Sequence, residues 1–451
     1  MGSPTFDLGV LASLGGGAIG CTWWLGAELT EFDGPTGSIA LVAGFSMLLW
    51  VGAAAWVIGR RPPVRATLVL VLLVAAVTRL LLVPGAPVLS DDIYRYVWDG
   101  RVQAAGINPY RYPPADPALS PLRDREIYPN LNRRESPTIY PPVAQGAFAL
   151  LYRAHPSSVA WTKLALVALD LVAVALLAGL LGLLGRRPEL SLLYAWHPLA
   201  IFEIGGSGHV EVLGVLGLLA ALHLALRGRA LLAGVLLAGA GLVKFYALAA
   251  LPAFAAGGRR LGLAIGVAAT VVLAYLPFLD VGPRVLGYLP GYLEEEGFSS
   301  GYRFYLLGLF ERLTGIEGAA PTALYVALAA ACLAGLSLSA MRITPSPAAL
   351  ANRALLLLAA VLVLATPTYP WYALAVIALL PLGRGLVLLP AGAVALTAPL
   401  LYLHISVPDH PTWPRHLAYG TWAVALALAA GLAARRHGVP ARALRPVEEA
   451  G

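Results

Sequence analysis

Long apolar runs separated by short polar connectors set the pattern of this chain. Many of these runs approach or exceed the roughly 18 apolar residues that a helix needs to cross a bilayer. We therefore predict an all-α polytopic membrane protein with about 12 membrane-spanning helices. The predicted spans are residues 8–27, 38–58, 66–83, 159–184, 190–204, 210–226, 261–279, 321–341, 354–366, 371–382, 386–403 and 417–434.

Two further apolar runs are predicted not to cross the membrane. Residues 144–154 form too short a run and lie between prolines, so we expect a helix on or dipping into the outer surface. Residues 230–256 have a Gly-rich middle, and Pro252 lies near their end. This run predicts a broken re-entrant hairpin, which a membrane tolerates when the hairpin is buried in protein.

Composition agrees with a membrane protein. Of the 451 residues, 59% are hydrophobic and 12% are charged, whereas soluble domains carry about 25% charged residues. The net charge of +7 is attributed to membrane topology, so no nucleic-acid partner is expected. Cys21 and Cys332 both lie in apolar runs, which predicts no disulfide framework.

The charges of the connectors predict the topology. The connector RRPPVR, residues 60–65, is basic, and the preceding connector, ELTEFDGPTG, is acidic. The positive-inside rule places the basic connector in the cytoplasm. We expect one membrane domain, residues 1–434, with its N-terminus inside and its first run retained as an uncleaved span. Its large outer loop is residues 84–158 and its second outer loop is residues 280–320, while residues 435–451 form a cytoplasmic tail.

The large outer loop opposes this rule in one respect. Between residues 84 and 140 it contains seven arginines, roughly balanced by seven acids. Either the loop is cytoplasmic after all, or these arginines have a role that requires them on the outer side. The later arginine-bearing connectors, at residues 186–187, 227–229, 259–260, 342–353, 384 and 435–436, are all expected inside.

The outer loop opens with the densest group of chemically active residues, SDDIYRYVWDGRVQAAGINPYRYPP, residues 90–114. Asp92, Arg95, Tyr96 and Asp99 follow the spacing i, i+3, i+4, i+7, so one helical face carries two acids, a cation and an aromatic ring. Asn108-Pro109 is expected to end this helix. A structural alternative stays open, in which Asp91 and Asp92 cap a surface helix while Arg95 and Arg101 pair with Asp99 and Asp92.

Ionisable residues inside apolar runs are costly and usually functional. Arg79 and Asp170 are expected to form a structural pair within the membrane. The other such residues are expected near one membrane face. They are Glu203, His209 and Glu211 in WHPLAIFEIGGSGHVE, Lys244 near the turn of the hairpin, and Arg303 after the second outer loop. His209 as a helix cap and Glu203 as a hydrogen-bonding group within the bundle remain alternatives.

Aromatic residues recur at the same predicted level. Tyr94, Trp98 and Tyr140 belong to the outer loop, while Tyr369 and Trp371 belong to TPTYPWY. With Asp99, Glu203 and Glu211 they are candidates to line a substrate site. An interfacial aromatic belt is the alternative.

These residue types suit one chemistry. A carboxylate at the lipid boundary can act as general base toward a hydroxyl, while neighbouring arginines and a lysine can bind a phosphate. The chain shows no nucleotide-binding pattern, so a phosphate at the membrane surface suggests a lipid phosphate.

Several motifs together resemble a known family: the acid segment at residues 90–114, IYPPVAQ, YAWHPLAIFEIGGSGHVE, LVKFYALAALP and TPTYPWY. They resemble the bacterial polyprenol-phosphate-mannose-dependent mannosyltransferases of the glycosyltransferase C superfamily, over residues 78–372. The resemblance implies an inverting transfer in which Asp91 or Asp92 is the general base. It also implies that Arg95, Arg101, His209, Lys244 and Arg303 contact the phosphate or sugar of the donor. The acid motif follows the third predicted span and not the first, which departs from the simplest layout of that superfamily.

Three functions are weighed. The favoured one transfers a hexose, mannose foremost, from a polyprenyl-phosphate donor to a glycolipid, polysaccharide or lipid-linked glycan outside the cell membrane. The alternatives are a transporter or flippase of a lipid-linked sugar, for which no internal repeat is found, and a membrane scaffold. The sequence identifies no cofactor, and the adjacent acids permit Mg²⁺ or Mn²⁺. The sequence leaves the oligomeric state and the acceptor open.

Overall fold

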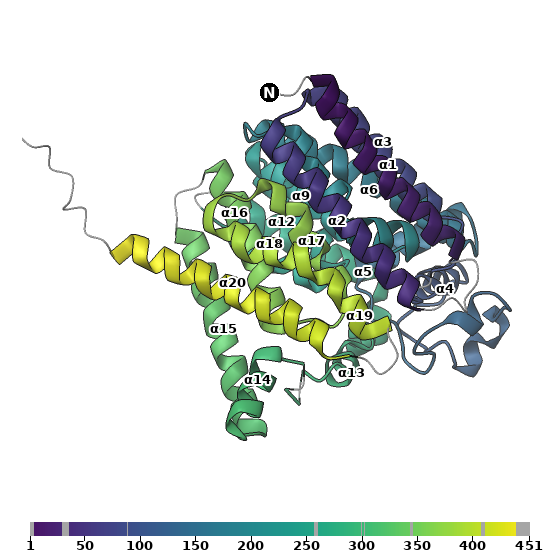
Figure 1. Cartoon of the computed structure of the whole chain (residues 1–451). Coiled ribbons are helices and arrows are strands. Elements are labelled where there is room, and N and C mark those ends of the chain that lie inside the picture. The colour runs from purple at the N-terminus through teal and green to yellow at the C-terminus, as the bar shows by residue number, and fades with distance from the viewer. Residues whose placement is uncertain are drawn as a thin grey trace, which may run out of the picture.

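Helices account for the architecture of the chain (Figure 1). The computed structural model describes residues 4–28, 36–87, 89–256, 260–298, 300–301, 303–342, 346–406 and 411–438. Within these ranges the chain forms helices joined by turns and loops, without a β-strand. Nine helical stretches of the described residues are long and apolar enough to cross a membrane. The predicted all-α polytopic fold is thereby confirmed.

Those nine stretches coincide with predicted spans. They are α1 (Pro4–Glu28), α2 (Thr36–Arg60), α3 (Val64–Leu82), α6 (Val159–Leu183), Arg260–Glu295 beginning with α12 (Arg260–Tyr275), α15 (Ala319–Arg342), α16 (Pro347–Ala365), Gly385–Ile405 including α18 (Leu388–Thr397), and α20 (Trp413–Gly438). The predicted tail begins within α20, and its residues 439–451 lie outside the described part of the chain.

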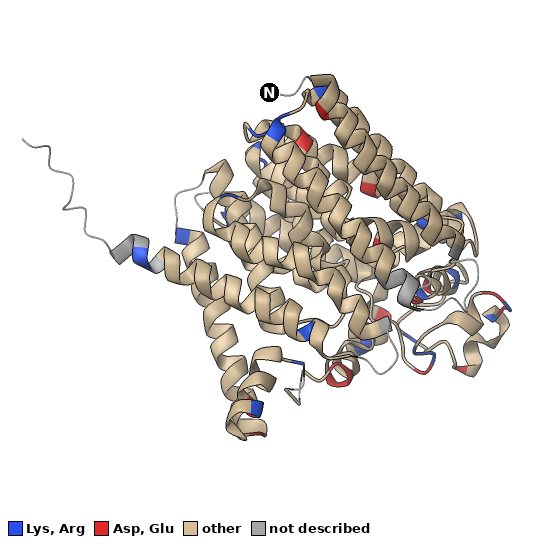
Figure 2. Cartoon of the chain, viewed as in Figure 1, with Lys and Arg blue, Asp and Glu red and all other residues tan. Residues whose placement is uncertain are grey.

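The surface of the bundle is apolar between two charged ends. Leu41, Val69 and Leu261 are 77%, 67% and 74% exposed. Large apolar side chains exposed in this way suit contact with hydrocarbon and not with water. Figure 2 shows Lys, Arg, Asp and Glu gathered at the ends of the bundle, with few of them along the long helices between.

A pair of opposite charges lies inside the bundle. Arg79 on α3 donates from Nε to Asp170 on α6 over 2.5 Å, and both side chains are fully buried. The guanidinium also donates to the carbonyls of Ala75 and Ala195, and the Tyr194 hydroxyl donates to Asp170. Burial without such partners would be strongly unfavourable. The predicted intramembrane pair is confirmed, and it ties α3 to α6.

The predicted hairpin is also confirmed. After α9 (Glu211–Leu226), α10 (Ala230–Gly241) runs toward Lys244, and the chain returns through η5 (Phe245–Ala250) and α11 (Leu251–Phe254). The return ends beside the start of α12, where Arg260 donates to the Ala255 carbonyl. Gly266 permits the contact of α12 with α10, because a Cβ there would lie 2.1 Å from the Leu231 carbonyl oxygen.

One predicted span is wrong as a single helix. Residues 190–204 form η3 (Pro188–Ser191), α7 (Leu192–Ala195), α8 (Pro198–Ala200) and the π-helical turn η4 (Ile201–Gly206). Pro198 lacks the amide hydrogen that would continue α7, and the His197 ring instead accepts a hydrogen bond from the Leu199 amide. Residues 371–382 are likewise broken, into η7 (Pro370–Ala373), α17 (Leu374–Leu379) and η8 (Leu380–Leu382).

Connectors predicted to be cytoplasmic meet at one end of the bundle. Arg187 donates to the carbonyls of Val57 and Ile58, at the end of α2, and Arg186 donates to that of Gly383. Arg353 and Arg260 reach the last turn of α15 in the same way, at Ala340 and Met341. These contacts are consistent with one membrane side for those connectors.

The two predicted outer loops lie together at the other end. The first carries α4 (Asp92–Ala104), the short 3₁₀ helices η1 (Pro117–Leu122) and η2 (Tyr128–Asn130), and α5 (Pro142–Ala154). The second carries η6 (Leu276–Leu286), α13 (Leu289–Glu295) and α14 (Tyr305–Thr314). The Tyr288 amide donates to the Thr138 carbonyl over 3.0 Å and links the two loops.

Candidate functional site

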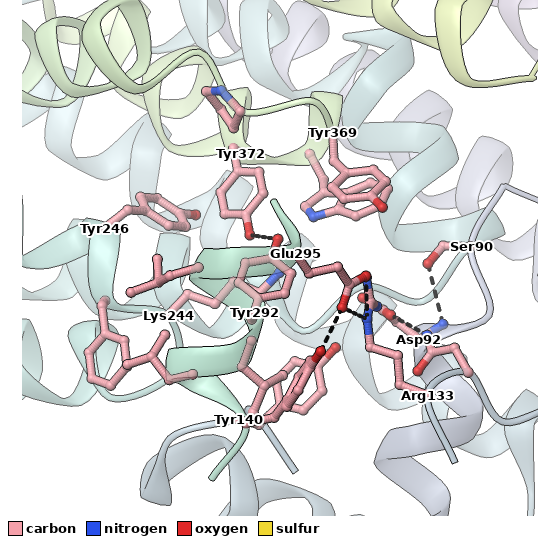
Figure 3. A pocket seen from close by; sticks show the side chains of 18 of the residues that line it. Ser90, Asp92, Arg133, Tyr140, Lys244, Tyr246, Tyr292, Glu295, Tyr369 and Tyr372 are labelled. Atoms are coloured by element: carbon pink, nitrogen blue, oxygen red, sulfur yellow. Dashed lines mark hydrogen bonds and ion pairs between the residues drawn. The ribbon is translucent and has the colours of Figure 1, made fainter. Parts of the chain in front are cut away.

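A cavity of about 580 Å³ opens where the two outer loops meet the hairpin and the start of η7. Figure 3 shows Asp92 and Arg133 on one side of it and Lys244 with Tyr246 on the other. The residues that line it include Ser90, Asp91, Asp92, Arg95, Asn132, Arg133, Tyr140, Lys244, Tyr288, Tyr292, Glu295, Arg303, Tyr369, Trp371 and Tyr372. An apolar part is formed by Leu289, Leu293, Phe298, Val361, Leu362 and Ala365.

α4 brings the acid motif to this cavity. Asp91 is its N-cap residue and Asp92 lies in its first turn, where negative charge is favourable. The helix ends at Gly106 in a left-handed conformation with φ +75°. The Gly106 amide donates to Gln103 and the Ile107 amide to Val102, which is a Schellman motif. The helix was predicted, but this glycine ends it before Asn108-Pro109.

A buried hydrogen-bond network holds α4 against α5. Arg95 donates from Nε to Asp99 Oδ1 over 2.9 Å, and Gln145 on α5 donates to Asp99 Oδ2 over 2.8 Å. Gln103 donates to the Gln145 side-chain oxygen over 2.9 Å. Every polar group in this network gains a partner, as burial requires. The alternative in which Arg95 pairs with Asp99 is therefore what the structure shows.

The two acids at the start of α4 share one donor. Asn132 Nδ2 lies 2.7 Å from Asp91 Oδ1 and 2.9 Å from Asp92 Oδ1. Protein around the partly open Asp91 displaces water and raises the pKa of its carboxyl, while the hydrogen bond from Asn132 opposes that rise. Asp92 is the acid that interacts electrostatically with Lys244 and Tyr140 across the cavity.

Each cation in the cavity wall is paired with a carboxylate. Besides the Arg95–Asp99 pair, Arg133 binds Glu295, Lys244 binds Glu211, and Arg303 binds Glu296. Arg303 also donates to the Thr368 hydroxyl, while its buried Nε has no partner among the described residues. The cations are thus held in place before any ligand enters.

A chain of buried polar groups lies behind Lys244. Glu211 contacts both Lys244 and His209, whose Nδ1 lies 3.3 Å from Glu211 Oε2. On its other side, His209 Nε2 lies 3.2 Å from Glu203 Oε2, and the Tyr402 hydroxyl donates to Glu203. Glu211 binds the Lys244 ammonium directly, so the arrangement of these groups helps to fix the position of that ammonium.

Aromatic rings form the opposite wall of the cavity. Tyr369 stacks on Trp371 with ring centroids 4.4 Å apart, and Trp371 stacks on His209 at 4.2 Å. The Tyr372 hydroxyl lies 3.2 Å from that of Tyr292, and the Lys244 ammonium is 4.9 Å from the Tyr372 ring centroid. Such faces suit both cations and the apolar faces of sugar rings.

Residues 8–257 match a family model described as "alpha-(1->6)-mannopyranosyltransferase, N-terminal domain". The chain belongs to this mannosyltransferase family. A relative named alpha-(1->6)-mannopyranosyltransferase B, from Corynebacterium glutamicum, is 30% identical over 249 residues. That alignment covers 49% of this chain and 41% of the relative.

The part that matches the mannosyltransferase family carries only one portion of the cavity wall. Asp91, Asp92 and Lys244 lie within the match, whereas Glu295, Arg303 and Tyr369 lie beyond it. The family match therefore bears on the acid motif and the hairpin but not on the second outer loop.

Eight of the residues predicted for the site line the cavity and seven do not. Asp91, Asp92, Arg95, Tyr140, Lys244, Arg303, Tyr369 and Trp371 line it, whereas Tyr94, Trp98, Asp99, Arg101, Glu203, His209 and Glu211 are not in its wall. The functional roles given to all fifteen stay predictions.

Arg101 is the clearest departure in position. It bonds Asp124 over 2.5 Å and the Ser157 hydroxyl over 2.9 Å, beneath the outer loop. The suggested pairing of Arg101 with Asp92 is therefore wrong. Arg101 lies almost three turns beyond Asp91 along α4, which carries it away from the acids at the start of the helix.

The second outer loop and the segment before α5 supply cavity residues that the sequence did not single out. Asn132 and Arg133 come from an irregular segment, and Tyr288, Tyr292 and Glu295 come from the turn before α13 and from α13 itself. Neither segment has an apolar period that would show which side chains face inward. The signals that were present are the excess of outer-loop arginines and the tyrosine-acid run GYLEEEG.

The possibility of a divalent cation stays a prediction. In the described part of the chain, no group of three or more His, Cys, Asp or Glu side chains could hold a metal ion. Asp91 and Asp92 turn toward the Asn132 amide, which supplies hydrogen-bond donors to both. The reaction steps below therefore use only the side chains of the chain.

Proposed function

We propose that this protein is an inverting mannosyltransferase that uses a polyprenyl-phosphate mannose donor. One observation carries the proposal: a pair of acids and several cations line a single cavity that also has an apolar part. A base for a hydroxyl, charges for a phosphate and a surface for a lipid chain are the groups that such a transfer needs.

The acids supply the base. Asp92, or Asp91 in its place, accepts the proton of an acceptor hydroxyl as that oxygen attacks the anomeric carbon. The bond from the anomeric carbon to the phosphate oxygen breaks on the opposite face, so the configuration inverts. An inverting reaction that forms an alpha linkage, as in the family's name, requires a beta-linked donor.

The cations supply charge for the leaving phosphate. Lys244 and Arg303 line the cavity from the hairpin and from the segment before α14. Positive groups already in position stabilise negative charge as it develops, at little reorganisation cost. Leu289, Leu293 and Leu362 offer an apolar surface for the first part of the polyprenyl chain.

The acceptor is proposed to be a glycan or glycolipid with a free primary hydroxyl on a mannose. This rests on the linkage in the name of the Corynebacterium relative. The reaction is proposed to take place on the outer face of the cell membrane. The connectors predicted to be cytoplasmic meet at one end of the bundle, and the cavity lies at the other end.

Purified protein in liposomes tests the proposal. With polyprenyl-phosphate mannose and a mannose-terminated oligosaccharide, the product should be one mannose longer. Movement of the donor across the bilayer without transfer would instead favour the transporter or flippase.

A further inference from the structure

The Arg133–Glu295 pair differs from the other ion pairs of the cavity. Arg133 Nη2 lies 2.6 Å from Glu295 Oε1, and Arg133 Nε lies 3.0 Å from both carboxylate oxygens. The pair joins the first outer loop to α13, and both residues line the cavity. A carboxylate bound in this two-point manner has the geometry that a guanidinium also offers to a phosphate.

This pair is also the most open one. The side chains of Arg133 and Glu295 are 31% and 42% exposed, against 5% and 8% for Arg303 and Glu296. An exposed pair contributes little to stability because water screens it. Arg133 can therefore exchange its partner at lower cost than the buried cations can.

We propose that Glu295 occupies the place of a lipid phosphate on Arg133 and is displaced when that phosphate enters. Arg133 is then a phosphate ligand, and Glu295 is its resident competitor. This inference rests on the proposed function for the identity of the lipid, whereas the exchange itself requires only a phosphate ester.

The inference predicts opposite effects for the two partners. Glu295→Gln removes the competitor and should tighten the binding of polyprenyl phosphate about 2–5-fold. Arg133→Gln removes the ligand and should weaken binding about 10-fold. The double variant should bind as Arg133→Gln does, because the other hydrogen bond of Glu295, from the Tyr288 hydroxyl, can also be accepted by the Gln side chain. A simple structural tie between the loops would give both single variants the same sign.

A second ion pair provides the matched control. Arg111 and Asp280 also join the two outer loops and are 42% and 48% exposed, but neither lines the cavity. Arg111→Gln and Asp280→Asn should leave the dissociation constant unchanged.

The measurement is the binding of polyprenyl phosphate to the full chain in detergent, with size-exclusion profiles as a folding check. The inference would be overturned if Glu295→Gln and Arg133→Gln changed the dissociation constant in the same direction. It would also be overturned if Asp280→Asn tightened binding as much as Glu295→Gln does. Inorganic phosphate is the second probe, and the same pattern at the same concentrations would show a free-phosphate site and overturn the lipid assignment.

Mannosyl transfer by the unaltered protein is measured in parallel. If the two variants change phosphate binding in opposite directions but the unaltered protein transfers no mannose, the exchange is supported and the proposed transferase function is rejected. If the protein transfers mannose but the two variants change binding in the same direction, only the exchange is rejected.

Discussion

Asp91 and Asp92 share one amide donor, but their other neighbours differ. Asp92 interacts with Lys244 and Tyr140 across the cavity, whereas Asp91 interacts with Arg133 near its mouth. Lys244 is the cation proposed to stabilise the leaving phosphate, and the acid that interacts with it is better placed to meet the attacking hydroxyl. This favours Asp92 as the base and leaves Asp91 to orient the acceptor.

The two acids can be separated by amide substitution. Asp92→Asn keeps the size of the side chain but cannot accept the proton, so transfer should fall by about 10²–10⁴-fold. Asp91→Asn should have a milder effect. Mannosyl transfer by each purified variant is the measurement, with polyprenyl phosphate binding as the control for folding. Near-normal transfer by both variants would remove the catalytic role of this pair.

Asn132 should set the pH dependence of the site. Its amide stabilises the ionised carboxylates, and its hydrogen bond lowers the pKa of Asp91 against the effect of burial. In Asn132→Ala the pKa of Asp91 rises, so the loss of activity on acidification should begin at a higher pH. The pH profile of kcat/KM tests this, and an unchanged acid limb would show that these carboxyls do not titrate in it.

The residue types of the site could be predicted, but their partners could not. The spacing of Asp92, Arg95 and Asp99 was visible in the sequence because a helix has a fixed period. Asn132, the partner of Asp92, and Glu295, the partner of Arg133, come from segments without such a period. Asn132 lies 40 residues from Asp92, and Glu295 lies 162 residues from Arg133. Only the folded chain shows that each of them meets its partner at the cavity.

At the scale of elements, α4 and α5 pack unusually closely. A Cβ on Gly100 would lie 2.5 Å from the Phe148 carbonyl oxygen and 2.6 Å from Tyr152 Cβ. Both obstacles belong to α5, so the helices would have to separate. That separation would disturb the network of Arg95, Asp99 and Gln145.

Gly100→Ala should therefore destabilise the protein, by about 1–3 kcal/mol if the strain resembles overpacking elsewhere. Gly146→Ala on α5 is the matched control, because no atom lies within 4 Å of its added Cβ. Thermal unfolding in detergent compares the two. Equal unfolding temperatures for both variants would contradict the close approach.

The length of the apolar runs predicted most of the long helices, but it did not predict where a helix is interrupted. Nine stretches match because hydrocarbon requires both length and apolarity. Residues 190–204 are also predominantly apolar, yet Pro198 and the π-turn before Ser207 interrupt them. The length of an apolar run does not reveal that a single proline, which lacks an amide hydrogen, ends a helix within it.

At the scale of the whole molecule, the cavity and the arginine-bearing connectors lie at opposite ends of the bundle. If the connectors are cytoplasmic, the cavity faces outward, and several of the arginines of the outer loop are explained by their partners. Arg101, Arg111 and Arg133 each bind a carboxylate.

Cysteine labelling tests this arrangement. In a background in which Cys21 and Cys332 are replaced by Ser, the exposed Ala118→Cys should react with an impermeant reagent in intact cells, and Pro63→Cys should not. Both become reactive once the membrane is opened. The reverse pattern would place the cavity inside.

The pairing of each cavity cation with a carboxylate also bears on turnover. A polyprenyl-phosphate mannose is a diester with one negative charge, whereas the polyprenyl phosphate left after transfer carries about −1.5 to −2. Four unpaired cations would hold this more highly charged product more tightly than the donor, and the enzyme would stall after one cycle. In the proposed reaction, a resident carboxylate such as Glu295 would reclaim its cation as the product departs, so a pair that orders the empty site would also limit product inhibition.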